Sequence, residues 1–297
     1  MIETRSRMVS FTKMQGTGND FVVLDNRSAQ LSPDELSACA AAWCPRRYGV
    51  GADGLLALDA PKTSAADYRM HYVNADGSRA TMCGNGARCL FRFARRAGFQ
   101  NDPLAFDTDA GLYRATTAPE DNPPGVRLFV PDVTEVRADV ALDRSVPQAV
   151  RRLCFAHAGT EHLVAVVDDL DAVPVQKWGR RLRRDPSLAP AGANVNFVEL
   201  GGEDGLRLRT YEKGVEAETP SCGTGVLAAA ETAGRLTGAD PETTLRVRTP
   251  GGKLAVGRAE GGTLHVPGPA VSVLDGCGQR LGDARCPLRS PAVFRVP

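Results

Sequence analysis

The feature that most constrains the fold of this chain is a short motif that occurs twice. "MCGNGARC" at residues 82–89 and "SCGTGVLAAA" at residues 221–230 each place Cys-Gly-x-Gly directly before a run with helical character. Strand-like segments flank both copies, and the motif cysteines, Cys83 and Cys222, are separated by about one domain's length of chain. The repetition predicts an α/β protein of two similar domains that face each other across a cleft.

The segments that follow the motifs support helices. Between residues 87 and 97, four apolar residues share one helical face, and the arginines, including Arg88, lie on the other face, which we expect to be solvated. Residues 226–236 are rich in alanine and nearly apolar, which predicts a buried helix. Ser32, followed by Pro33 and Glu35, has the pattern of a helix N-terminus with a capping box.

Composition bounds the functional class. The chain has 297 residues with 42% hydrophobic and 24% charged residues and a net charge of +1, so nothing indicates a nucleic-acid partner. No apolar run is long enough to span a membrane, and the N-terminal segment lacks the apolar core of a signal peptide. We therefore expect a cytoplasmic protein with no membrane partner.

The cysteines do not form a recognisable scaffold or metal motif. Eight cysteines in 297 residues are too sparse for a disulfide framework, and their spacing matches no zinc pattern. No Cys-x-x-Cys pair occurs, which argues against a dithiol redox protein. We expect no metal, and we interpret Cys39, Cys44, Cys89 and Cys154 as small buried hydrophobic residues.

The position of each motif cysteine before a helix indicates acid–base chemistry. A helix N-terminus carries a partial positive charge that stabilises a thiolate, so we expect the thiol pKa to be lowered towards neutrality. Inverting a carbon next to a carboxylate requires a base on one face and an acid on the other, and Cys83 and Cys222 supply two such groups. The backbone of Gly84–Asn85 and Gly223–Thr224 would hold the carboxylate. This scheme needs no cofactor.

The quoted motifs also carry a resemblance. In order along the chain they are "FTKMQGTGNDFVVLDN", "GVGADGL", "NADGSRATMCGNGARC", "GANVNFVEL", "YEKG", "ETPSCGTG" and "PGG". Over roughly residues 9–278 the chain resembles diaminopimelate epimerases, which are cofactor-independent enzymes of bacterial lysine and peptidoglycan synthesis. The resemblance implies that LL- and meso-diaminopimelate are interconverted. It also implies a homodimer and two pseudo-symmetric domains, each a mixed sheet wrapped around a central helix, with the active site between them.

Sequence and resemblance together predict the domain boundaries and the site residues. The sequence itself places the domain boundary near Pro131, just past "VRLFV", so the first domain would span residues 1–131 and the second residues 132–267. The resemblance implies that a strand near residues 268–280 returns to the first domain. Cys83 and Cys222 would be the catalytic pair, and His162 an assisting residue. The residues implied in binding a small amino-acid substrate are Asn19, Asn74, Gly84, Asn85, Thr160, Asn194, Glu212, Lys213, Gly223 and Thr224.

Three positions depart from the family pattern. Lys213 stands where the family usually has Arg, and Thr160 with Glu161 stands where it often has Asn-Pro. Gly54 stands where some members have a polar residue. The first two departures fall where the family binds the distal end of diaminopimelate. Lysine can still pair with a carboxylate, although it lacks the fork of donors that arginine has.

These departures keep other interpretations open. The first alternative is a related two-cysteine racemase or epimerase, of the proline racemase or hydroxyproline epimerase kind, that acts on a different amino acid. A pyridoxal-phosphate racemase would need a Schiff-base lysine, for which no sequence context is present. A binding module would not need two cysteines. Each asparagine also has a structural interpretation as a turn residue, and His162 as a buried residue.

Overall fold

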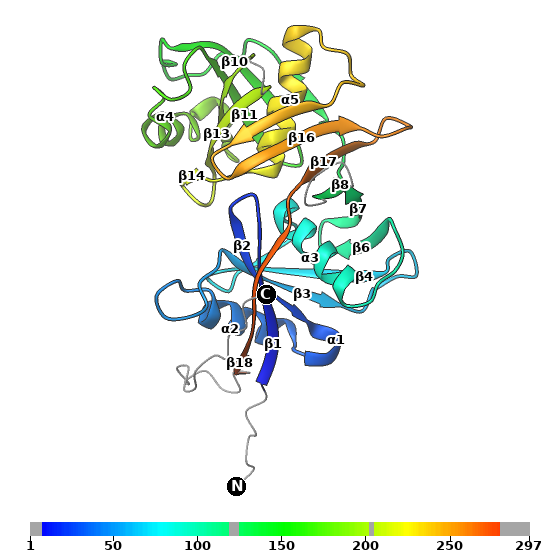
Figure 1. Ribbon diagram of the computed structural model, residues 1–297. Helices are drawn as coiled ribbons and strands as arrows, with labels where there is room; N and C mark the ends of the chain where they lie inside the picture. Colours follow the sequence, from blue (N-terminus) through cyan, green and yellow to red (C-terminus); the bar gives the residue numbers. More distant parts are fainter. Residues whose placement is uncertain (1–7, 119–124, 202–204, 280–297) are drawn as a thin grey trace. The chain divides into compact units, whose positions relative to one another are not determined.

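The computed structural model describes residues 8–118, 125–201 and 205–279 (Figure 1). They form two compact units. The first runs up to Leu128 and resumes at Pro269, and the second spans Phe129–Gly268. No helix in the described ranges is both long and apolar enough to cross a membrane.

The first unit is a mixed sheet with three helices. The pairing order is β18-β1-β2-β3-β4-β6-β7, parallel at β2–β3 and β4–β6 and antiparallel elsewhere, and β5 adds to β4. Its elements are β1 (Met8–Gly16), β2 (Asn19–Asp25), α1 (Asn26–Ala29), α2 (Pro33–Trp43), β3 (Gly54–Asp59), β4 (Tyr68–Asn74), β5 (Arg79–Ala80), α3 (Gly84–Arg96), β6 (Leu104–Thr108), β7 (Gly111–Ala118), β8 (Gly125–Phe129) at the boundary, and β18 (Val271–Gln279).

Helix α2 begins as its sequence predicts. The Ser32 hydroxyl accepts a hydrogen bond from the Glu35 N–H, the Glu35 side chain accepts one from the Ser32 N–H, and Pro33 occupies the first turn. This capping box satisfies N–H groups that would otherwise lack partners. The buried side of α2, which includes Leu36 and Trp43, packs with residues of β1, β2 and β3 in one hydrophobic cluster.

Helix α3 follows the predicted pattern except at one arginine, since Arg96 is exposed and Arg92 and Arg95 are partly exposed. Its apolar residues Ala87, Leu90, Phe91 and Ala94 are buried, as expected. Arg88 was expected on a solvated face, but it is completely buried. The prediction is wrong because helical periodicity does not reveal which distant segments cover a residue. Here Thr17 and Pro269 supply hydrogen-bond acceptors to the Arg88 guanidinium.

The second unit repeats the plan with a different chain path. Its pairing order is β9-β10-β11-β12-β13-β15-β16-β17, parallel at β11–β12 and β13–β15. Its elements are β9 (Glu135–Arg137), β10 (Val150–His157), β11 (Glu161–Val167), α4 (Val175–Leu182), the 3₁₀ turn η1 (Pro186–Leu188), β12 (Asn194–Glu199), β13 (Leu206–Glu212), β14 (Ala217–Thr219), α5 (Gly223–Thr237), β15 (Leu245–Thr249), β16 (Gly252–Arg258) and β17 (Leu264–Gly268).

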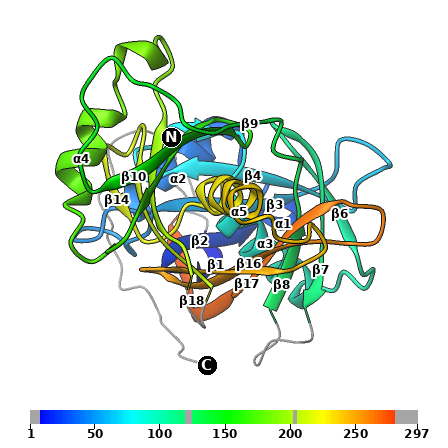
Figure 2. The same ribbon diagram turned by 90° about the horizontal axis from the view of Figure 1, so that it is seen from above.

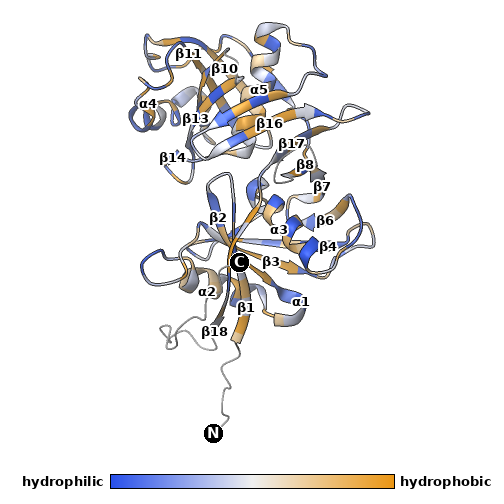
Figure 3. Cartoon of the chain, viewed as in Figure 1, coloured by the Kyte–Doolittle hydropathy of each residue, from blue (hydrophilic) through white to orange (hydrophobic). Residues whose placement is uncertain are grey.

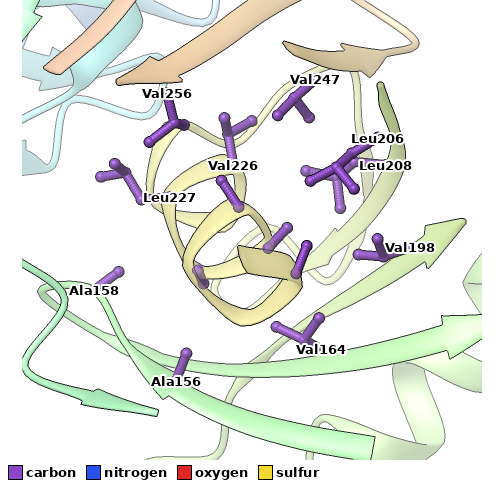
Figure 4. Close-up of a cluster of buried hydrophobic side chains, with 14 of the residues drawn as sticks. Ala156, Ala158, Val164, Val198, Leu206, Leu208, Val226, Leu227, Val247 and Val256 are labelled. Carbon is purple, nitrogen blue, oxygen red and sulfur yellow. The ribbon is translucent and has the colours of Figure 1, made fainter. Parts of the chain in front are cut away.

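Helix α5 lies at the centre of this unit, with strands around it (Figures 1 and 2). Val226 and Leu227 of α5 pack with Val164, Val198 and Val256 from three different strands (Figure 4). A helix covered on most sides must be apolar on most sides, which explains its run of alanines. The hydropathy colouring shows apolar and polar residues alternating along the strands of this unit, as expected for strands with one face towards the helix (Figure 3). The predicted α/β class, with a mixed sheet around a buried helix, is confirmed.

Candidate active site

Cys83 lies at the N-terminus of α3. It is the N-cap residue, in extended conformation with φ −141° and ψ 119°, and it is half-buried. Its Sγ lies 3.6 Å from Asn19 Oδ1, and Asn85 Nδ2 lies 3.5 Å from the same oxygen. The structure therefore brings together Cys83, Asn19 and Asn85, three residues that the sequence singles out from two separate motifs.

A charged network holds Asn19 in place. The Asn19 amide donates to Asp53 Oδ2 at 2.6 Å, and Arg46 donates both to Asp53 and to Asp20. Burial raises the pKa of Asp20, but hydrogen bonds from Arg46 and Lys13 outweigh it and bring the pKa to about 2. Sequence reasoning did not single out Asp53 or Arg46, although Asp53 lies within the quoted motif "GVGADGL".

Cys222 occupies the equivalent position before α5. It is the N-cap residue with φ −115° and ψ 111°, and its Sγ lies 3.5 Å from Thr224 Oγ1. Unlike Cys83 it is buried, and burial raises its thiol pKa well above the usual range. The Glu212 carboxylate raises it further, while the Thr224 hydroxyl and the Gly225 N–H lower it only in part.

The expectation of a thiol pKa near neutrality is therefore wrong for Cys222. The helix N-terminus favours the thiolate, but the desolvation of a buried anion is the larger effect. The raised pKa favours the protonated form of the Cys222 thiol. Glu212 is the last residue of β13, which pairs with the antiparallel strand β14 that precedes Cys222. The Thr219 hydroxyl of β14 donates a hydrogen bond to the Glu212 carboxylate.

The two glycines of each motif have different surroundings. A Cβ on Gly225 would lie 2.4 Å from Asn196 Oδ1, and a Cβ on Gly86 would lie 3.0 Å from a methyl group of Leu56. By contrast, a Cβ on Gly223 would meet nothing within 4 Å, and one on Gly84 would meet only a Leu128 methyl group at 3.6 Å. The second glycine therefore allows close packing, and the first leaves space beside the cysteine.

His162 and Asn194 are neighbours in the parallel pair β11–β12. His162 is completely buried, and its Nδ1 accepts a hydrogen bond from Asn196 Nδ2 at 3.0 Å. Burial, with a smaller contribution from nearby Lys213, lowers the pKa of His162 to about 3, so the ring is neutral. Because Asn196 Nδ2 can only donate, the ring proton lies on Nε2, which has no hydrogen-bond partner within the described ranges.

Asn196 is a site residue that sequence reasoning missed. It binds His162 Nδ1, donates to Leu163 O at 3.0 Å and accepts from Thr210 Oγ1 at 3.0 Å, and it packs against Gly225 at the start of α5. The signal was its place two residues after Asn194 in "GANVN", which puts both side chains on one face of a strand.

Lys213 and Thr160 both contact Glu161, a residue to which the sequence assigned no role. Lys213 Nζ forms an ion pair with the Glu161 carboxylate, and Thr160 Oγ1 donates to the same carboxylate at 3.1 Å. The hydrogen bond from Lys213 is the largest cause that lowers the pKa of Glu161 to about 2. The Lys213 backbone N–H donates to Asn194 Oδ1 at 2.9 Å, which ties this group to β12.

Asn74 ends β4 in a turn. Its side chain donates to Ser78 Oγ at 3.0 Å, and its backbone N–H donates to Ser78 O at 2.8 Å. These contacts fit the turn interpretation, and its substrate role stays a prediction. As for metals, the described part of the chain contains no group of three or more His, Cys, Asp or Glu side chains placed to hold an ion.

Comparison with known proteins places these features in a family. The family model described as diaminopimelate epimerase matches residues 11–131 and 154–271. A diaminopimelate epimerase from Chlorobaculum tepidum is 39% identical over 270 residues, covering 89% of this chain and 98% of its own.

Two solved structures share the fold. A PhzF-family phenazine biosynthesis protein from Bacillus anthracis aligns with a TM-score of 0.70 at 16% identity, covering 91% of this chain and 99% of its own. A hydroxyproline epimerase from Agrobacterium vitis aligns with a TM-score of 0.62 at 17% identity, covering 92% and 93%. On the family match and the identity over nearly its whole length, the chain belongs to the diaminopimelate epimerase family and is an enzyme of the isomerase class.

Proposed function

We propose that this enzyme interconverts LL- and meso-diaminopimelate with Cys83 and Cys222 as its acid/base pair and without a cofactor, in the synthesis of lysine and peptidoglycan precursors. The observation that carries the proposal is the matched placement of the two thiols. Each is the extended N-cap residue of a helix, followed by a glycine that leaves space beside the sulfur. The family match supports diaminopimelate as the substrate.

The proposed reaction is a proton exchange at one carbon. One thiolate removes the α-proton and becomes a thiol, while negative charge moves onto the substrate carboxylate. N–H groups at the helix N-terminus stabilise that charge. The thiol on the opposite face then donates its proton to the carbon and becomes a thiolate. Since its raised pKa favours the protonated form of Cys222, this thiol is the donor when Cys83 acts as base, and the roles exchange in the other direction.

We assign the remaining residues to substrate binding. Asn19 and Asn85 lie beside Cys83, and Thr224 lies beside Cys222, so they would contact the reacting end. The Nε2–H of His162, which has no hydrogen-bond partner among the described residues, would donate to the substrate. Lys213 would bind the distal carboxylate, and Glu161 would hold the lysine in place while the site is empty. Asn74 and Asn194 would supply further hydrogen bonds.

The alternative is a two-cysteine racemase or epimerase of another amino acid. The Glu161–Lys213 ion pair favours it, because Lys213 already has a carboxylate partner within the chain. One experiment separates the two. Purified protein is incubated in D₂O with LL-diaminopimelate or with lysine, and α-deuteration and stereoisomers are followed by NMR and chiral chromatography. Deuteration of diaminopimelate with formation of the meso isomer supports the proposal, and a clear preference for lysine contradicts it.

We also propose that the enzyme works in the cytoplasm as a homodimer, as the family resemblance implies. Light scattering on the purified protein measures its mass directly. A mass near twice 31.5 kDa supports the dimer, and a mass near 31.5 kDa contradicts it. Cell fractionation tests the location.

A further inference from the structure

The buried arginine of α3 is not explained by the proposed chemistry alone. Arg88 has 0% of its surface exposed. Its Nη2 donates to Thr17 Oγ1 at 2.8 Å and to Asn85 Oδ1 at 2.6 Å, and its Nε donates to Pro269 O at 3.4 Å. These acceptors are neutral oxygens. Within the described ranges Arg88 forms no ion pair with a carboxylate, and burying a cation without an anionic partner is costly, so such a residue needs a reason beyond packing.

The anionic group that Arg88 can support is Cys83. Burial lowers the pKa of the Arg88 guanidinium, whereas the cysteines on either side, Cys89 and Cys83, raise it when they ionise. Cys89 is fully buried, and burial raises the pKa of its thiol to about 12, so it stays neutral. Cys83 is half-buried, and its charge would be felt by the guanidinium through a poorly solvated interior.

Arg88 also fixes the orientation of Asn85. A guanidinium can only donate hydrogen bonds, so the Asn85 amide must turn its oxygen towards Arg88. Its Nδ2 then donates to Asn19 Oδ1 at 3.5 Å, and the same oxygen accepts a hydrogen bond from the neutral Cys83 thiol at 3.6 Å. The order of donors and acceptors around Cys83 therefore depends on Arg88.

Arg88 also contacts the turn between β1 and β2, through Thr17. Gly16 pairs with Asn19, so Thr17 and Gly18 form a two-residue hairpin turn, with φ values of 56° and 79°. Such a turn favours Asn-Gly, and a β-branched residue in the left-handed region is strained. Thr17 is 1% exposed, and its hydroxyl accepts the hydrogen bond from Arg88.

The turn and the start of α3 are packed tightly together. A Cβ on Gly16 would lie 3.1 Å from the Asn85 carbonyl oxygen and 3.3 Å from Cys89 Sγ. The strained turn therefore holds Asn19 within hydrogen-bond distance of Cys83 and Asn85. Arg88 donates hydrogen bonds both to Thr17 of the turn and to Asn85 of α3.

We propose that Arg88 is a positioning residue for Cys83. Its buried guanidinium holds Asn85 and the Gly16–Asn19 turn against the start of α3, where Asn19 accepts from the neutral thiol, and its positive charge favours ionisation of that thiol when it acts as a base. The part that concerns turnover rests on the proposed function, because it takes Cys83 to be one of the two acid/base groups. The part that concerns thiol reactivity does not, and the two are tested separately.

The first test needs no substrate. The alkylation rate of Cys83 by iodoacetamide at neutral pH is measured by peptide mass spectrometry in Arg88→Met, Arg88→Lys and the matched control Arg95→Met. Arg95 lies on the same helix and donates to the backbone of Asn101. We expect Arg88→Met to react about 10-fold more slowly, Arg88→Lys to recover most of the rate, and the control to match the parent.

An unchanged alkylation rate in a folded Arg88→Met variant would overturn the proposal. If that variant does not fold, Arg88→Gln takes its place, because it keeps a donor for Asn85 and removes the charge. Thermal unfolding by circular dichroism establishes that each variant is folded at the assay temperature.

The second test separates positioning from general stability. With Cys222→Ala, α-proton exchange in D₂O reports on the Cys83 face, and with Cys83→Ala it reports on the Cys222 face. Adding Arg88→Met is expected to slow the first exchange about 10-fold and to change the second less than about twofold. Arg88→Lys should restore the first exchange.

Equal loss on both faces would show a merely structural role and sink the proposal. The proposed function fails in a different way. In that case the parent enzyme exchanges no α-proton of diaminopimelate at all, and the alkylation test still decides the effect of Arg88 on the thiol.

Discussion

Cys83 and Cys222 occupy the same position in the two copies of the motif, but their surroundings differ. Cys83 is half-buried beside two asparagines, whereas Cys222 is buried beside Glu212 and Thr224. Burial and the Glu212 carboxylate both raise the pKa of the Cys222 thiol and so favour its protonated form.

If both thiols act on one carbon, neither can be removed. We expect Cys83→Ala and Cys222→Ala each to lose about 10²–10⁴-fold or more in epimerisation, because inversion needs a group on both faces. Each variant should still exchange the α-proton of one stereoisomer, since exchange on one face needs one base. Epimerisation is followed by chiral chromatography and exchange by NMR in D₂O. Near-normal epimerisation by either variant would end the two-base account.

The second prediction at this scale concerns Lys213. If it binds the distal carboxylate, Lys213→Ala should reduce turnover of diaminopimelate about 10²-fold, on the scale for breaking a desolvated charge pair. Lys213→Arg should keep substantial activity because the charge remains. Lys177→Ala is the control, since Lys177 is exposed on α4. Values of kcat/KM decide the outcome, and full activity of Lys213→Ala would show that the substrate has no distal carboxylate there.

At the scale of the element, the first turn of α5 contains one glycine that packs against a neighbouring strand and one that leaves space beside Cys222. Gly225 lies against Asn196 of β12, which in turn holds His162 of β11. The helix N-terminus, the buried imidazole and the parallel strand pair therefore form one connected structure. Gly223, two residues earlier, faces open space.

The two glycines give a matched pair of variants. Gly225→Ala should destabilise the protein by about 1–3 kcal/mol, because its Cβ would lie 2.4 Å from Asn196 Oδ1. Gly223→Ala should change stability by less than about 0.5 kcal/mol and still reduce kcat/KM, because its methyl group occupies space beside Cys222. Urea denaturation and steady-state kinetics measure the two effects. The assignment fails if Gly223→Ala is fully active.

For the whole molecule, the buried histidine couples stability to pH. The pKa of His162 is about 3 in the folded protein and near 6.5 in the unfolded chain. Below pH 6.5 the unfolded chain binds a proton that the folded protein does not, so stability falls as pH decreases towards 3. The limiting slope for one proton is about 1.4 kcal/mol per pH unit.

His162→Gln should flatten this dependence between pH 6.5 and about 4. The midpoint of urea unfolding at pH 7.5, 5.5 and 4.5 measures it, with His157→Gln on the neighbouring strand as control. The carboxyl of Asp20, with its pKa lowered to about 2, adds a separate loss of stability as pH falls from about 4 to 2, reduced by its partial exposure. A steep pH dependence that persists in His162→Gln would contradict the assignment.

Much of this protein could be predicted from local sequence rules. Ser32, Pro33 and Glu35 predict the start of α2 because a capping box is a contact between near neighbours. The repeated motif predicts that Cys83 and Cys222 precede helices, and the alanine-rich run predicts the buried helix α5. In each case the signal is local, either a contact between near neighbours or a continuous run of small apolar residues, so the sequence determined the outcome by itself.

Only the tertiary structure decided the properties that depend on distant segments. Arg88 is buried because Thr17 and Pro269, far from it in the sequence, meet at its guanidinium. The thiol of Cys222 has a raised pKa because strands cover α5 and bring Glu212 close to it. Burial of a polar group by distant segments sets its electrostatics, and for Arg88 and Cys222 the residues nearby in the sequence do not indicate which segments cover them.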